Sequence, residues 1–279
     1  VNANTSAEGH NWASAAIAPD YTVKLSSNSD AKRRSAYDYE GGEPANTPPA
    51  GYIWNNALSA GLSLRTYGIW STNVPLEKVE NGHQIASVKD PALRSYADLN
   101  FRGFDLNYSD IDRSKEFIRE WSEFSQKGQA PQLVVMRLGN DYTFGTTPGK
   151  LSPVALIAQN DQAVGMLVQA VSQSPFWSST AIFIVEAAAA GGADHVDSHR
   201  STAYVISPYT RRGLVDSSMY NQTSILRTIE AVFDLRPMTL FDAASPVMFG
   251  CFSTKPDTTP YTLVPPRVSL TEQNSTSRL

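Results

Sequence analysis

Short apolar runs alternate with amphipathic segments along most of this chain, and this alternation constrains the fold more than any other feature. Runs rich in β-branched residues are typical of buried strands, whereas apolar residues spaced three and four apart indicate helices. The predicted strands are 64–70, 133–138, 181–186 and 202–207, and the predicted helices are 54–61, 112–126, 161–172 and 223–235. Strands that alternate with helices favour an α/β fold with a mostly parallel central sheet and helices on both faces.

The two ends of the chain are less regular than its middle. The first fifty residues carry many polar and turn-forming side chains with little sustained periodicity. Beyond Cys251, four prolines disfavour both helix and strand. We therefore expect a folded domain over residues 1–252 and an extended tail over residues 253–279.

Composition excludes several classes of protein. The chain has 279 residues, of which 41% are hydrophobic, so it can bury a sizeable core. Its formal net charge of −4 gives no electrostatic footprint for nucleic acid. No apolar run approaches the roughly 20 residues that a membrane span needs, and no signal peptide is recognisable. A single cysteine rules out an internal disulfide framework.

The segment after the strand at 181–186 holds the densest cluster of ligand-type side chains. Two Asp, two His and one Arg fall within seven residues, from Asp194 to Arg200. Open α/β sheets bind ligands beyond the carboxyl ends of their strands, and Asp and His bind divalent metals. Four alanines at 187–190 separate the strand from this cluster and offer no donor atom. The cluster therefore resembles a metal site with part of its ligand set missing, and the alternative is an ordinary polar loop.

A second polar turn follows the strand at 133–138. It reads Gly139-Asn-Asp141, which places a carboxylate at a strand end, where a metal ligand is expected. Asp in this position is also a common turn residue, so the turn alone does not decide between the two roles.

Several longer motifs resemble the bacterial phosphoesterase family of the alkaline phosphatase superfamily. The motifs are Glu8-Gly-His-Asn-Trp-Ala13, Ala18-Pro-Asp-Tyr21, Tyr39-Glu-Gly-Gly-Glu-Pro-Ala-Asn-Thr-Pro-Pro-Ala-Gly-Tyr-Ile-Trp54, Asp194-His-Val-Asp-Ser-His-Arg200, Ala203-Tyr-Val-Ile-Ser-Pro-Tyr-Thr-Arg-Arg-Gly213, Leu226-Arg-Thr-Ile-Glu230 and Leu235-Arg-Pro-Met238. Together they extend the resemblance over about residues 3–252. In that family the domain often follows a β-propeller of YVTN repeats.

The resemblance implies an alkaline-phosphatase-like fold and a metal-dependent phosphoester hydrolase. It implies a divalent cofactor (Zn, Ca, Mg or Mn), a phosphoester substrate and a secreted or periplasmic location. A β-propeller domain or a second copy of the chain is the expected protein partner. Nucleic acid and a membrane span are not expected.

The resemblance also suggests roles for individual residues. The metal ligands it suggests are Asp141, Asp194, His195 and His199. His10 and Arg200 are the expected substrate-binding residues, since an Arg guanidinium can hold a phosphate through two hydrogen bonds. For His10, a structural role in the irregular N-terminal backbone is the alternative. We expect His10, Asp141 and residues 194–199 to converge on one edge of the sheet.

Three departures from the family pattern bear on activity. The family's metal-binding Glu-Asn pair and Thr nucleophile precede the segment that opens this chain, so we expect the N-terminal part of the family domain to be missing. Where the family reads Glu-Asp-Asp-Ala-Gln, this chain reads Glu186-Ala-Ala-Ala-Ala190. The family's Asn-Asp-His-Thr turn reads Asn140-Asp-Tyr-Thr143 here. Because Ala has no donor atom, these losses weaken any metal site.

Two functions therefore stay open. The first is a metal-dependent phosphoester hydrolase domain that is inactive as written, because its nucleophile and metal carboxylates are absent. The second is a catalytically silent binding or structural domain of a secreted or surface assembly. The alanines themselves have three candidate origins: evolutionary loss, deliberate inactivation, or acidic side chains recorded as alanine.

Overall fold

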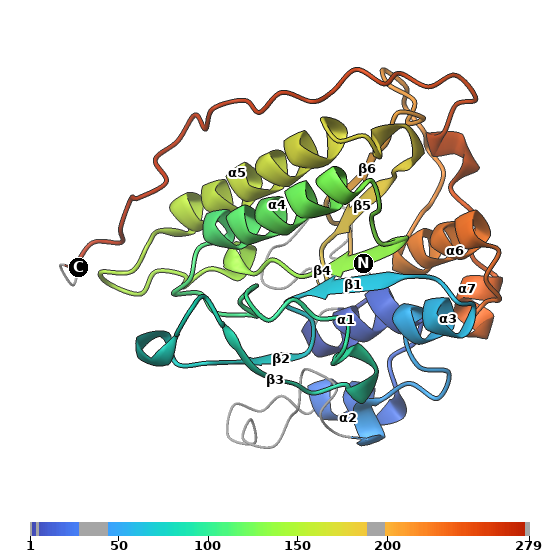
Figure 1. Ribbon diagram of the computed structural model, residues 1–279. Coiled ribbons are helices and arrows are strands. Elements are labelled where there is room, and N and C mark those ends of the chain that lie inside the picture. The colour runs from blue at the N-terminus through green and yellow to red at the C-terminus, as the bar shows by residue number, and fades with distance from the viewer. Residues whose placement is uncertain (1, 4–5, 28–43, 189–198, 277–279) are drawn as a thin grey trace. The chain divides into compact units, whose positions relative to one another are not determined.

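The computed structural model describes residues 2–3, 6–27, 44–188 and 199–276 (Figure 1). The chain divides into two compact units. The first comprises Val1–Leu64 and Ser179–Asp257, and the second comprises Arg65–Ser178 and Thr258–Leu279. Among the described residues, no helix is long and apolar enough to cross a bilayer.

The first unit combines helices from both ends of the chain with one small sheet. Its elements are α1 (Ser6–Ala15), α2 (Asp20–Ser27), α3 (Ile53–Ser59), β5 (Ile182–Val185), β6 (Ala203–Ile206), α6 (Gln222–Phe233) and α7 (Leu240–Ala243). Asn221 begins α6 as its N-cap, accepting a hydrogen bond from the Ser224 backbone N–H. Helix α1 packs against α6, and the Trp12 ring meets the edge of Phe241 at a centroid distance of 5.1 Å. These contacts tie the N-terminal helix to the C-terminal part of the unit.

The second unit is built around two packed helices. Its elements are β1 (Leu64–Tyr67, whose first residue lies at the unit boundary), β2 (Ser71–Asn73), β3 (Ile85–Val88), α4 (Asp110–Lys127), β4 (Leu133–Met136) and α5 (Pro153–Ser172). Strand β1 pairs with β4 in a small parallel sheet, and β2 pairs with β3 in an antiparallel hairpin. Helix α4 lies between β1 and β4 in sequence, as parallel pairing requires a long crossover.

The ends of α4 and α5 follow from local sequence. Ser109 caps α4 by accepting from the Asp112 N–H, and Gly128 ends it in the left-handed conformation that favours glycine. Ser152 caps α5, and Pro153 occupies its first turn. The helices pack on each other, with the Ser114 hydroxyl donating to the Ala163 carbonyl at 3.2 Å. This helix pair forms the centre of the second unit.

The tail runs beside α5 without regular secondary structure of its own (Figure 1). The Tyr261 N–H donates to Ser172 at the C-terminal end of α5, and the Ser152 hydroxyl at the other end donates to Glu272. Between these ends, the Gln159 amide donates to the Leu270 carbonyl. These hydrogen bonds hold the described part of the tail along the length of α5, and the division into a domain over residues 1–252 and an extended tail stays a prediction.

The structure confirms the α/β class and the positions of all four predicted strands. The predicted mostly parallel sheet is wrong for β5 and β6, which pair antiparallel with Ile182 opposite Ile206. Parallel pairing needs a crossover that is usually helical, and the described residues between β5 and β6 contain no helix. Because the two strands pair antiparallel, with Val185 opposite Ala203, β6 starts at the same edge where β5 ends.

The predicted helices also occur, with two differences. Helix α5 begins at Pro153, eight positions before the start that periodicity indicated, because Ser152 and Pro153 provide the start signal. Helices α1 and α2 lie in the first fifty residues, where no helix was predicted. The buried residues of α1 are Ala7, Gly9, Asn11 and Ala15, which are too small or too polar to form a recognisable apolar stripe.

Candidate functional site

At the end of β5, the backbone of α1 lies very close to the backbone that follows the strand. Gly9 of α1 lies against the residues that follow the strand, so that a Cβ atom added at Gly9 would lie 1.7 Å from the carbonyl oxygen of Ala187. Only glycine permits this approach, since real Cβ atoms do not come within 3.0 Å of another heavy atom. The Gly-His-Asn-Trp motif therefore has a physical role: it seats α1 directly on the segment after β5.

A buried glutamine holds the same segment from the other side. The Gln222 side chain, at the start of α6, donates from Nε2 to the carbonyls of Glu186 and Ala187, both at 2.9 Å. Its Oε1 accepts from the Asn2 N–H at 2.8 Å, and the Asn2 side chain accepts from the Gln222 N–H. Gln222 is almost fully buried. One side chain thus satisfies the backbone at the strand end and ties it to the N-terminal segment.

The described residues at this strand end do not fit a divalent metal. Ala187 and Ala188 have no donor atoms, and Gln222 already engages the carbonyls of Glu186 and Ala187. Nowhere in the described ranges do three or more His, Cys, Asp or Glu side chains gather in a way that could hold a metal ion. Divalent metals need several converging oxygen, nitrogen or sulfur ligands, which this part of the site does not supply.

The predicted site residues of the first unit lie close in sequence to this edge. His10 is half-buried on α1, directly after the glycine that contacts Ala187. His199 and Arg200 are exposed and precede β6, which begins at the edge where β5 ends. Asp194 and His195 lie outside the described residues, so their role as ligands stays a prediction.

The polar turn after β4 has a structural network at its centre. Asp110, at the start of α4, is fully buried, and its carboxylate accepts hydrogen bonds from the backbone N–H groups of Gly139 and Asn140. The Asn160 amide and the Arg113 guanidinium also donate to it, at 2.9 and 2.8 Å. In return, the Asn140 side chain accepts from the Asp110 N–H. The network locks the turn to α4 and α5.

Asp141 follows Asn140 in a short 3₁₀ turn and is exposed. It belongs to the second unit, whereas His10, His199 and Arg200 belong to the first. Its predicted role as a metal ligand, and the predicted convergence with His10 and residues 194–199, stay predictions.

Residues 152–236 match the Phosphoesterase family. The matched span contains α5, β5, the segment after it, β6 and α6, so the β5 edge lies well inside it. The predicted resemblance to a phosphoesterase family is thus confirmed for this span. No curated protein matches the chain.

The matched span also contains a buried acid that sequence reasoning did not single out. Glu230 of α6 is fully buried, and burial together with the neighbouring Asp242 carboxylate raises the pKa of Glu230 to about 8. Burial opposes ionisation of Asp242 as well, but hydrogen bonds from Glu230 and from the Met238 and Thr239 N–H groups lower its pKa. Near neutral pH the pair therefore retains a proton on Glu230, which joins α6 to the start of α7.

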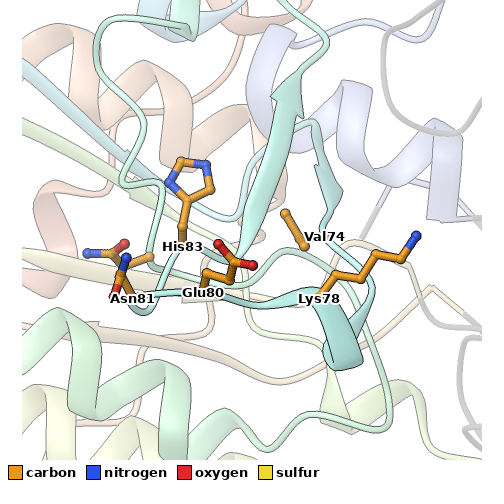
Figure 2. Close-up of a pocket in the computed structure, with 6 residues that line it drawn as sticks. Val74, Lys78, Glu80, Asn81 and His83 are labelled. Atoms are coloured by element: carbon orange, nitrogen blue, oxygen red, sulfur yellow. The ribbon is translucent and has the colours of Figure 1, made fainter.

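A shallow polar hollow lies elsewhere, in the second unit. Its volume is about 420 Å³, and it is lined by Val74, Lys78, Glu80, Asn81, His83 and Asn100, mostly from the segment that joins β2 to β3 (Figure 2). Lys78, Glu80, Asn81 and His83 are all exposed. Glu80 and His83 share a turn in which the His83 N–H donates to the Glu80 carbonyl. The hollow holds no buried polar side chain that would orient a ligand.

Three residues that shape the site were missed by sequence reasoning: Gln222, Asp110 and Glu230. Asp110 lies just before the predicted helix at 112–126, where an acidic residue is common and indicates no further role. Glu230 ends the motif Leu226–Glu230, but nothing in that motif indicates its pairing with Asp242, and Gln222 gave no signal. Both roles depend on partners more than ten residues away.

Proposed function

We propose that this chain is a phosphoester hydrolase domain of the metal-dependent, alkaline-phosphatase-like type, with its site at the end of β5. The observation that carries the proposal is the contact of Gly9 with Ala187, because it joins the motif at residues 8–13 to a strand end inside the matched span. Any residue other than glycine at position 9 would prevent this contact between the two backbones.

The residues around this edge have distinct roles in the proposal. Gln222 fixes the backbone after β5, and His10 and Arg200 bind the phosphoester, the latter through its two-pronged guanidinium. Asp141, Asp194, His195 and His199 remain the proposed metal ligands. From the family resemblance we also propose Zn, Ca, Mg or Mn as the cofactor, a secreted or periplasmic location, and a β-propeller or a second copy as partner.

We further propose that the chain is inactive while alanine occupies positions 187 and 188. Without side-chain oxygens there, the described part of the site has too few ligands for tight metal binding. The second candidate function, a silent domain that binds a phosphoester without turning it over, is favoured by the way Gln222 engages the carbonyls of Glu186 and Ala187.

Restoring the acidic side chains tests both functions. The double variant Ala187→Asp/Ala188→Asp is compared with the unmodified chain and with Ala60→Asp/Ala181→Asp, which adds two carboxylates at exposed positions. Metal binding is measured by calorimetry with Zn²⁺ and Mn²⁺ and by the metal-induced rise in Tm, and turnover is measured with 4-nitrophenyl phosphate and bis(4-nitrophenyl) phosphate.

The proposal expects tight metal binding, with a rise in Tm, only in the Ala187→Asp/Ala188→Asp variant, because a ligand that binds only the folded state stabilises it. Metal-dependent turnover by the unmodified chain would refute the proposed inactivity. If the restored variant binds metal no better than the Ala60→Asp/Ala181→Asp control, the hydrolase site is wrong. Phosphoester binding without metal would then support the silent domain.

A further inference from the structure

The loop after β4 carries an aromatic surface that the proposed function does not use. Phe104 lies at its centre: the Arg137 guanidinium lies 4.7 Å from the Phe104 ring centroid, and the Tyr142 ring meets it edge-on at 5.7 Å. Tyr142 is nevertheless 63% exposed. Most of its ring is therefore open to solvent, in a fixed position against Phe104.

A second cation–aromatic pair lies on the same two loops. The Lys150 ammonium is 4.8 Å from the Phe144 ring centroid and donates to the Asn107 side chain at 3.0 Å. Phe144 is two residues from Tyr142, so the Cα atoms of these two residues are at most about 7 Å apart. Asn107 is three residues from Phe104, so their Cα atoms are at most about 10 Å apart. We refer to Phe104, Arg137, Tyr142, Phe144 and Lys150 together as the aromatic–cation surface.

The backbone between Tyr142 and Phe144 is strained. Thr143 has φ 58° and ψ 169°, a combination that is essentially confined to glycine, and Thr is β-branched. Its hydroxyl accepts from the Gly145 N–H at 3.1 Å, and its own N–H donates to the Asn140 carbonyl. Such strain costs on the order of 1–3 kcal/mol, persists only where the surrounding structure imposes it, and is common at active sites, ligand clamps and switch regions. Here it fixes the directions of the two flanking aromatic side chains.

The charges of the surface indicate what it binds. Arg137 and Lys150 supply two positive charges, whereas Asp141 in the same turn supplies one negative charge, and the nearby Asp105 carboxylate pairs with Arg102. We propose that the aromatic–cation surface binds a planar aromatic anion, whose ring stacks on Tyr142 and whose negative group pairs with Lys150. Ring stacking and a charge-assisted contact together recognise such a ligand. The surface shares its turn with Asp141, a proposed metal ligand, but binding of the anion requires neither a metal nor hydrolysis.

Binding of 2-naphthalenesulfonate tests the proposal, because this probe carries a planar ring and a negative charge but no phosphoester. Titration calorimetry with the full chain is expected to show saturable binding to one site. Neutral 2-naphthol, which lacks the charge, and methanesulfonate, which lacks the ring, are expected to bind at least tenfold more weakly. Absence of saturable binding of 2-naphthalenesulfonate would overturn the proposal.

Variants locate the site. Tyr142→Ala is expected to weaken binding of 2-naphthalenesulfonate at least tenfold, and Tyr142→Phe to leave it unchanged. Lys150→Ala is expected to weaken binding of the sulfonate but not that of 2-naphthol, whereas Asp141→Asn is expected to strengthen binding of the sulfonate about twofold by removing the opposing charge.

Tyr209→Ala is the matched control, because Tyr209 is also partly exposed but lies in the other unit. Unchanged far-ultraviolet circular dichroism would confirm that each variant is folded. Equal binding by Tyr142→Ala, Lys150→Ala and the unmodified chain would place the probe elsewhere and refute the site.

Discussion

The ends of β4 and β5 are both followed by polar segments in the sequence, yet the two strand ends are held by different means. After β4, a buried carboxylate accepts hydrogen bonds from the turn and from Arg113, so that side chains hold the backbone. After β5, a glycine allows helix α1 to touch the backbone, and an uncharged amide from Gln222 satisfies the carbonyls. The first end relies on charge, and the second relies on shape.

This difference matters for function. The charged groups at the centre of the β4 turn are fully engaged, and the exposed side chains around it carry the aromatic–cation surface. At the β5 end the described residues hold the backbone through uncharged groups. Charged side chains near this end are therefore not required to hold the backbone. A polar segment after a strand is therefore not by itself a site, because its central groups can serve the fold.

The largest effect is expected at Gly9. In Gly9→Ala the new Cβ would overlap the Ala187 carbonyl oxygen, so α1 must move away from the β5 end. We expect a loss of at least about 3 kcal/mol in the free energy of unfolding, at the upper end of single substitutions. Urea unfolding followed by circular dichroism measures it.

Gly145→Ala is the control for Gly9. Gly145 has φ 57°, and no heavy atom lies within 4 Å of the place that an alanine Cβ would take, so only backbone strain of about 1–2 kcal/mol is expected. Equal losses in the two variants would mean that the contact between Gly9 and Ala187 is not tight.

Asp110→Asn tests the charged strand end. It leaves the buried Arg113 guanidinium without its carboxylate, and removing one partner of a buried ion pair costs about 3–5 kcal/mol. Asp112→Asn changes a nearby half-exposed acid whose ion pair with Lys115 is worth at most about 1 kcal/mol. Comparable losses in the two variants would contradict a special role for charge at this end.

The raised pKa of Glu230 makes the free energy of unfolding depend on pH in the unit that contains the β5 end. Its folded pKa of about 8 lies above the ordinary value of 4.5, so the folded state binds the proton more tightly than the unfolded state. The stabilisation is complete below pH 4.5 and is lost as pH rises toward 8, with a slope of up to about 1.4 kcal/mol per pH unit.

Denaturant unfolding at pH 5, 6, 7 and 8 measures this slope. Glu230→Gln, which cannot ionise, should flatten it, whereas Glu123→Gln, at a half-exposed position, should not. A stability profile that Glu230→Gln leaves unchanged would show that this carboxyl does not retain its proton.

The smallest effect is expected at Gln222. Gln222→Ala removes the donors to the carbonyls of Glu186 and Ala187 and leaves these groups to find other partners. We expect a loss of about 1–3 kcal/mol, as for other buried groups that lose their hydrogen bonds. Gln222→Glu should be at least as damaging, because a carboxylate cannot donate to two carbonyls. Wild-type stability in either variant would show that shape alone, through Gly9, holds this end.

Local patterns in the sequence predicted most of the secondary structure. The spacing of Phe117 and Trp121 indicated α4. The sequence offered Asn221 or Thr223 as the cap of α6, and the structure has Asn221; caps and apolar stripes are local properties. Helix α1 was not predicted, because its buried face consists of small or polar side chains that form no apolar stripe. The antiparallel return from β5 to β6 could not be predicted, since a strand's direction depends on its connection rather than on its own residues.

The candidate site was predicted only in part. The motif at residues 8–13 and the segment after β5 were both recognised, but nothing local shows that Gly9 contacts Ala187, almost 180 residues later. The same holds for Asn140, whose partner Asp110 lies 30 residues earlier. Contacts between distant residues are set by packing, and a single sequence does not record them.

The tail along α5 has a mechanical consequence. Its hydrogen bonds follow one another in order, from Tyr261 at Ser172, through Leu263 at Gln169 and Leu270 at Gln159, to Asn274 at Lys150. A pulling force applied beyond residue 274 would load and break these hydrogen bonds one after another, starting at Asn274, rather than all at the same time. The tail would therefore peel from α5 at low force, while the packed pair α4 and α5 beneath it stays intact.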